Sequence, residues 1–85
     1  MTSLANQINI GSVLAQKLAE IGITTIEQLR ITGAEQAFIR LETLDCTACI
    51  NMLYALEGAV QGVRWHSLPK ERKHELMEFF RSLKK

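Results

Sequence analysis

Two cysteines have the spacing in this chain that most directly suggests chemistry. Cys46 and Cys49 form a Cys-x-x-Cys pair, which occurs in redox sites and in zinc sites. A thioredoxin-like redox site needs a βαβ context, which the sequence does not show, and a zinc site needs two further ligands. The two histidines, His66 and His74, are separated by seven residues, whereas zinc fingers expect three to five. We therefore expect both cysteines to be unreactive, either in the core or near the surface.

An acid–base site would require Tyr54, Glu57 and His66 to converge. Nothing in their spacing fixes the three side chains together, so the simpler interpretation is that Glu57 makes a structural hydrogen bond and His66 lies in a loop. The sequence also lacks a glycine-rich phosphate loop, a nucleophile elbow and a metalloprotease motif. We therefore predict no enzyme activity, no cofactor, no metal and no small-molecule substrate.

The segment formed by Asn9, Ile10, Gly11 and Ser12 is a candidate for phosphate binding. It precedes a predicted helix, whose first backbone N–H groups and positive dipole end favour an anion. With a second glycine turn at 21–23 it is similar to a helix-hairpin-helix element, which contacts the DNA backbone without reading sequence. The alternative is that the hairpin only packs helices together. Charge favours this alternative, because residues 1–63 carry three basic and six acidic side chains, a net charge of −3.

The basic residues are concentrated after residue 63. Residues 64–85 carry seven Lys or Arg and three Glu, a net charge of +4. One interpretation is a solvated face of the last helix, whose cations complement the helix dipole. The other is a weak surface for an anionic partner. Because three glutamates are interleaved in the sequence, we favour the solvated face. The candidate basic residues are Arg64, Lys70, Arg72, Lys73 and Arg81, followed by Lys84 and Lys85.

Length and composition limit the classes of protein to which the chain can belong. The 85 residues are enough for one domain, predicted to span 1–85, and 47% hydrophobic with 22% charged residues is a globular composition. The sequence pI of 7.8 is below the value of about 9 typical of basic nucleic-acid-binding domains. No apolar run approaches the roughly 18 residues of a membrane span, and no signal-peptide pattern is present. With so few cysteines, the expected location is cytoplasmic.

Five helices are predicted, and no segment alternates convincingly as a strand does, so the expected fold class is all-α. The first helix is predicted over about Ser12–Glu20, with Ser12 as its N-cap. Capping boxes at Thr24–Glu27 and Thr32–Glu35 are predicted to open the second and third helices. Together with the glycine turns they indicate helix-hairpin-helix-like elements.

The fourth helix is expected to be the central, buried one. It is predicted over about Thr47–Val63, capped by Asp45, because a wide apolar stripe covers much of its circumference. Gly58 and Gly62 form a small-x-x-x-small pair, which would let another helix approach closely. The last helix is predicted from Pro69 to about Leu83.

A family resemblance covers about residues 4–81. The run Asn51-Met52-Leu53-Tyr54-Ala55-Leu56-Glu57-Gly58-Ala59-Val60-Gln61-Gly62-Val63-Arg64-Trp65 is similar to the most characteristic stretch of the TfoX C-terminal domain, of the TfoX/Sxy competence-regulator family. Residues 9–12, 18 and 21–23 resemble the opening of that domain, and residues 68–76 resemble its closing helix. Ser12 stands where the family often has proline. The resemblance implies a compact all-α domain, related to helix-hairpin-helix folds, in bacterial proteins that regulate natural competence and DNA uptake.

We interpret the characteristic run as a packing pattern rather than a ligand site. Asn51 and Tyr54 are expected to bond the hairpin loops to the central helix, and Trp65 to close one end of the core. The leading hypothesis is a non-enzymatic regulatory module that binds a protein partner, and the alternative is a nucleic-acid-binding module that uses residues 9–12. The run's candidate structural residues are Asn51, Leu53, Tyr54, Glu57, Gly58, Gly62 and Trp65.

Overall fold

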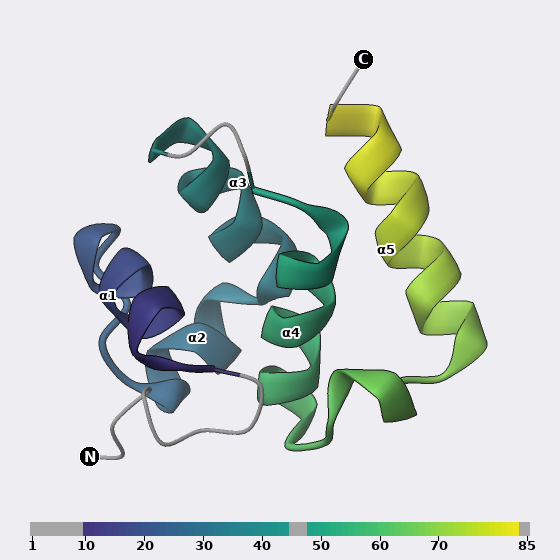
Figure 1. The fold of residues 1–85 in the computed structure, drawn as a ribbon, viewed down its shortest axis with the longest axis horizontal. Coiled ribbons are helices and arrows are strands. Elements are labelled where there is room, and N and C mark those ends of the chain that lie inside the picture. The colour runs from purple at the N-terminus through teal and green to yellow at the C-terminus, as the bar shows by residue number, and fades with distance from the viewer. Residues whose placement is uncertain (1–9, 45–47, 84–85) are drawn as a thin grey trace.

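The structure, a computed structural model, describes residues 10–44 and 48–83. This part of the chain forms five α-helices and one short 3-10 helix: α1 (Ser12–Glu20), α2 (Ile26–Thr32), α3 (Ala34–Leu44), α4 (Ile50–Gln61), η2 (Trp65–Ser67) and α5 (Lys70–Leu83). Helix α4 lies in the middle, with α1, α2 and α3 on one side and α5 on the other (Figure 1). The predicted all-α class is confirmed, while the helix-hairpin-helix detail stays a prediction.

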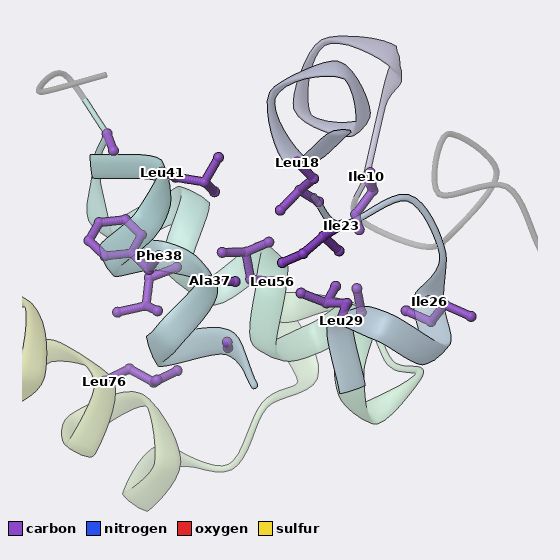
Figure 2. Packing of buried hydrophobic residues seen from close by; sticks show 14 of the residues in the cluster. Ile10, Leu18, Ile23, Ile26, Leu29, Ala37, Phe38, Leu41, Leu56 and Leu76 are labelled. Carbon is purple, nitrogen blue, oxygen red and sulfur yellow. The ribbon is translucent and has the colours of Figure 1, made fainter. Parts of the chain in front are cut away.

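A single cluster of buried apolar side chains holds the helices together. Figure 2 shows it continuing from Leu18 on α1 past Leu56 on α4 to Leu76 on α5. Every α-helix contributes at least one side chain with no exposed surface: Leu18, Leu29, Phe38, Leu56 and Leu76. Helix α4 is central to this cluster, as its sequence predicts, with Leu53, Leu56 and Ala59 all buried.

Helices α1 and α4 end in the same kind of glycine turn. Gly22 and Gly62 have φ of 87° and 75°, and the N–H of each bonds to the carbonyl three residues back. The N–H of the following residue bonds to the carbonyl five residues back, with all four bonds between 2.9 and 3.2 Å. This is a Schellman cap, which favours glycine because its φ is positive. The tight turn expected at Gly22 is confirmed, whereas Gly62 caps a helix instead of forming a helix-packing pair with Gly58.

The capping box of α2 lies one residue later than its predicted position. The Gln28 N–H donates to Thr25 Oγ1 at 3.1 Å, and the Thr25 N–H donates to Gln28 Oε1 at 3.2 Å. The predicted Thr24–Glu27 box is therefore wrong. The chain offers threonine at both 24 and 25 and a suitable partner three residues after each, so local spacing cannot choose between the two registers.

One residue, Gly33, joins α2 to α3. Its N–H donates to the Leu29 carbonyl at 2.8 Å, and its carbonyl accepts from the Ala37 N–H at 3.0 Å. The predicted capping box at Thr32–Glu35 is wrong, because Thr32 is the last residue of α2 and Gly33 is the residue before α3.

The predicted boundaries of the last two helices need smaller corrections. Helix α4 begins at Ile50, directly after Cys49, and ends at Gln61, so it is shorter at both ends than predicted. The predicted cap Asp45 lies outside the described residues. Helix α5 begins one residue after Pro69, whose carbonyl accepts from the Lys73 N–H at 3.0 Å, and it ends at Leu83 as predicted.

Candidate functional site

One face of α4 meets η2 and α5, and it carries three polar side chains. Tyr54, Glu57 and Gln61 are three and four residues apart, a spacing that places them on one side of a helix. Glu57 is only 7% exposed, and Tyr54 is half-buried. Tyr54 and Glu57 of the characteristic run therefore face an interface within the domain.

Arg72 of α5 connects three helices through carboxylates. Its Nη2 lies 2.9 Å from Glu57 Oε1 on α4 and 2.9 Å from Glu35 Oε1 on α3, and its Nη1 lies 3.2 Å from Glu75 Oε1 on α5. Gln61 Nε2 donates to the other oxygen of Glu57. Both oxygens of this buried carboxylate thus have partners, which offsets the several kcal/mol that burying an unpaired charge costs. We call these five residues the Arg72 cluster.

The Arg72 cluster raises the pKa of Arg72 above its ordinary value. The hydrogen bond to Glu57 is the largest cause; partial burial opposes it, and the bonds to Glu35 and Glu75 add to it. A pKa raised by folding stabilises the protein at every pH below the value in the unfolded chain, and this stability is lost only as the pH rises beyond it. That window lies in the strongly alkaline range, so Arg72 remains charged and provides no switch near neutral pH.

Stacked rings form a second connection between α4, η2 and α5. The Trp65 ring stacks on Tyr54 with centroids 5.8 Å apart and planes at 14°, and on His66 with centroids 3.9 Å apart and planes at 28°. Lys73 Nζ lies 5.8 Å from the Trp65 ring centroid and donates to the His66 carbonyl at 3.3 Å. An ammonium at this distance over an indole is a cation–π contact. We call Tyr54, Trp65 and His66 the ring stack.

The other residues of the characteristic run serve the core and the helix ends. Leu53 and Gly58 are buried, and Gly62 forms the cap described above. Trp65 is half-buried and packs against the apolar cluster. Asn51 is exposed in the first turn of α4, and the hydrogen bonds expected from Asn51 and Tyr54 to the hairpin loops stay predictions.

The segment expected to bind phosphate has ordinary backbone geometry. Ile10 is buried, and Gly11 is exposed with φ −98°, so glycine is not required there by a positive φ. Ser12 is the first residue of α1, and the residue before the helix is Gly11, so the prediction that Ser12 is the N-cap is wrong. Asn9 lies outside the described residues. Phosphate binding at this segment stays a prediction.

The candidate basic residues have different environments. Arg72 belongs to the Arg72 cluster and Lys73 contacts the ring stack, whereas Arg64, Lys70 and Arg81 are exposed. Arg81 lies 3.8 Å from Glu78, a distance typical of a weak surface pair. Lys84 and Lys85 lie outside the described residues.

The cysteine pair is only partly described. Cys49 is a free, exposed thiol directly before α4, and Cys46 lies outside the described residues. Over residues 10–44 and 48–83, no group of three or more His, Cys, Asp or Glu side chains could hold a metal ion. In the same part of the chain, no helix has both the length and the apolar character needed to cross a membrane.

Two further contacts between distant residues are not predicted by the sequence. Glu35 pairs with Arg72, 37 positions away, and Arg30 Nε donates to the Val60 carbonyl in the last turn of α4 at 3.3 Å. A cation at this end of a helix is favourable because it complements the carbonyl dipoles. No local spacing reveals either partner, since each contact exists only once the helices are packed.

The fold and the interface between α4, η2 and α5 define a small all-α domain. Its last helix is fixed to the central one by a buried ion-pair cluster and stacked rings. The model of the TfoX C-terminal domain family matches residues 1–80. The chain belongs to this family.

Known proteins are similar to this chain in sequence, and solved structures are similar to it in fold. The chain is 36% identical over 75 residues to Protein Sxy of Escherichia coli (strain K12), a match that covers 88% of this chain and 36% of Sxy. The chain thus spans about a third of the length of that curated relative. An uncharacterized protein from Listeria monocytogenes, solved in a triclinic crystal form, matches with a TM-score of 0.96 and 46% identity over 98% of this chain and 94% of the other. A Listeria monocytogenes protein of unknown function, solved in a tetragonal form, matches with a TM-score of 0.91 and 48% identity over 94% and 99%.

Proposed function

We propose that the chain is a regulatory interaction module of the competence-regulator type, which acts by binding a protein partner and has no catalytic activity of its own. The observation that carries this proposal is the match to Protein Sxy, which covers 88% of this chain but only 36% of Sxy. A domain that recurs within a longer relative is suited to act as a module that presents a binding surface.

The use of the polar side chains supports the same proposal. Glu57, the buried carboxylate of the characteristic run, has both oxygens occupied by Arg72 and Gln61. Tyr54 stacks on Trp65, which in turn stacks on His66. These groups hold the helices in place, which is what a rigid binding surface needs.

A genetic experiment tests the regulatory role. In the bacterium that encodes the chain, deletion of its gene should lower the transcripts of DNA-uptake genes and the transformation frequency by at least about tenfold. The wild-type chain should restore both, and Leu56→Asp, which places a charge in the core, should not. Unchanged transcripts and transformation in the deletion strain, under conditions that induce uptake, would refute the role.

A binding experiment tests the protein partner. The folded domain is used to capture proteins from lysate, and each captured protein is then purified and titrated against wild type. Ile31→Glu is titrated alongside wild type as a surface variant. Ile31 is 86% exposed, so the fold does not depend on it. The proposal requires at least one purified protein that binds the domain directly and saturably. It fails if every captured protein loses binding once it is purified.

A further inference from the structure

The charged side chains of α5 are interleaved in sequence, but the lysines and the glutamates lie on different sides of the helix. At 100° per residue, Lys70, Lys73 and Arg81 fall within an arc of about 80°, whereas the three glutamates occupy a separate arc of about 60°. Between the two arcs, on the far side, lies the buried seam that contains Leu76 and Arg72. The glutamate arc lies between Arg72, which bonds Glu75, and Arg81, which lies 3.8 Å from Glu78. The helix therefore presents one cationic edge: Lys70, Lys73 and Arg81.

The cationic edge adjoins the ring stack. Lys73 belongs to both, because its Nζ lies 5.8 Å from the Trp65 ring centroid and donates to the His66 carbonyl. Helix η2 lies next to the start of α5 (Figure 1). The segment 62–69 that connects α4 to α5 contains no Asp or Glu and adds Arg64. Cations and aromatic rings are thus combined on one surface without a carboxylate in the connecting chain.

Within the ring stack, His66 is the ring most open to a ligand. Trp65 and Tyr54 are half-buried and stack on each other, whereas His66 is exposed. A planar group that stacks on the imidazole would add to the existing ring contacts. Stacking of a nucleobase on a side-chain ring strengthens binding by about 5- to 150-fold per base and tolerates any base.

We propose that the surface formed by His66, Lys70 and Lys73, with Arg64 and Arg81 at its margins, binds single-stranded nucleic acid. One unpaired base stacks on His66, and the neighbouring phosphates contact the two lysines. A single strand fits better than a duplex because only an unpaired base exposes its face to the ring. An acidic peptide would use the cations but would leave the ring without a partner. This binding is additional to the protein partner proposed above and does not depend on it.

Direct binding tests the proposal, and the chain contains its own reporter. Trp65 is the only tryptophan, so its fluorescence reports events at the ring stack. An oligothymidine of about 15 nucleotides at low salt should change this fluorescence saturably. The two lysine–phosphate contacts predict a slope of about −1.4 for log K against log salt. The same oligonucleotide as a duplex with oligoadenine should bind at least about fivefold more weakly.

Variants with a matched control locate the surface. The anisotropy of a labelled oligothymidine gives the affinity of each variant without relying on Trp65. His66→Ala should weaken binding by at least about fivefold, the lower end of the stacking contribution. Lys70→Gln should weaken binding at low salt and should reduce the salt slope by roughly the share of one phosphate contact. Arg40→Gln removes the same charge from an exposed site on α3 and should change affinity by less than about twofold. Thermal unfolding confirms that each variant remains folded.

Four outcomes would overturn the proposal. They are no saturable binding of oligothymidine at low salt, equal or tighter binding of the duplex, equal loss of affinity in Arg40→Gln and Lys70→Gln, and equally tight binding of polyglutamate. Loss of binding in Gly11→Val with wild-type affinity in His66→Ala would instead assign the contact to the start of α1. Capture of a protein partner should be unchanged by Lys70→Gln, so failure of this proposal is distinguishable from failure of the proposed regulatory role.

Discussion

The two sides of α4 are attached to it by different forces. Helices α2 and α3 contribute six fully or nearly fully buried apolar side chains, from Ile26 and Leu29 to Ala34, Ala37, Phe38 and Leu41. Among the described helices, α5 is the longest but contributes only Leu76 at that level of burial. It is also held by the Arg72 cluster, by the contact of Lys73 with the ring stack, and by half-buried side chains such as Phe80, which packs on Phe38. One side therefore depends on buried apolar area, and the other depends to a greater extent on paired charges and aromatic contacts.

The two sides also differ in charge. Residues 1–63 have a net charge of −3, and residues 64–85 have a net charge of +4. The small total of +1 therefore conceals an uneven distribution, and three of the cations, Lys70, Lys73 and Arg81, lie along one edge of α5. Attraction to a polyanion would thus be directional, and it would be strongest at low ionic strength.

The largest expected effect tests the apolar side. Leu18→Ala removes a side chain of α1 that has no exposed surface, so it should lower the free energy of unfolding by about 3–4 kcal/mol. Val13→Ala on the same helix is the control, because Val13 is 69% exposed and should cost less than about 0.5 kcal/mol. Chemical denaturation followed by far-ultraviolet circular dichroism measures both. Comparable losses in the two variants would contradict the position of the core in α1.

An intermediate effect is expected on the polar side. Arg72→Ala leaves the buried Glu57 carboxylate without its cation, and since Arg72 is itself 25% exposed, the loss should be about 2 kcal/mol. Denaturation of wild type and variant by urea, repeated at low and high salt, measures this loss in the free energy of unfolding. The loss should shrink at high salt for Arg72→Ala and remain constant for Leu18→Ala. If both variants respond equally to salt, the contrast between the two sides is wrong.

The smallest expected effect concerns a helix start. Thr25→Ala removes the acceptor of the Gln28 N–H and should cost about 1 kcal/mol. Thr24→Ala serves as the matched control: the Thr24 hydroxyl bonds only to the Gln28 side chain, and Thr24 is exposed, so it should cost less. Thermal unfolding distinguishes the two. A greater loss in Thr24→Ala would restore the capping register originally predicted from the sequence.

Local patterns predicted the helices well because their causes are local. Apolar periodicity identified α4 as central, and the glycine at 22 marked the end of α1. The exact residues at which helices start are harder to predict. The paired threonines at 24 and 25 fit two capping registers, and Gly33 serves two helices at once.

The interface at α5 was harder to predict because its partners are distant in sequence. The run containing Tyr54, Glu57 and Trp65 was recognisable, but the contact of Glu57 with Arg72 and of Trp65 with Lys73 arises only when α5 packs on α4. The sequence does contain the separation of charges on α5. The helical angles show this separation, whereas the order of residues along the chain hides it. For this reason the interleaved glutamates alone favour the interpretation as a mixed, solvated face.

The junction at Gly33 determines how tolerant the domain is of changes in length. Because its N–H completes one helix and its carbonyl begins the next, the chain has no spare residue between α2 and α3. A residue inserted elsewhere in a surface turn lengthens a loop at little cost. An insertion at Gly33 would instead shift the register of α3 relative to α2 and turn Phe38 away from Phe80. Insertions and deletions should therefore be rarer at this junction than in the turns that precede α2 and α5.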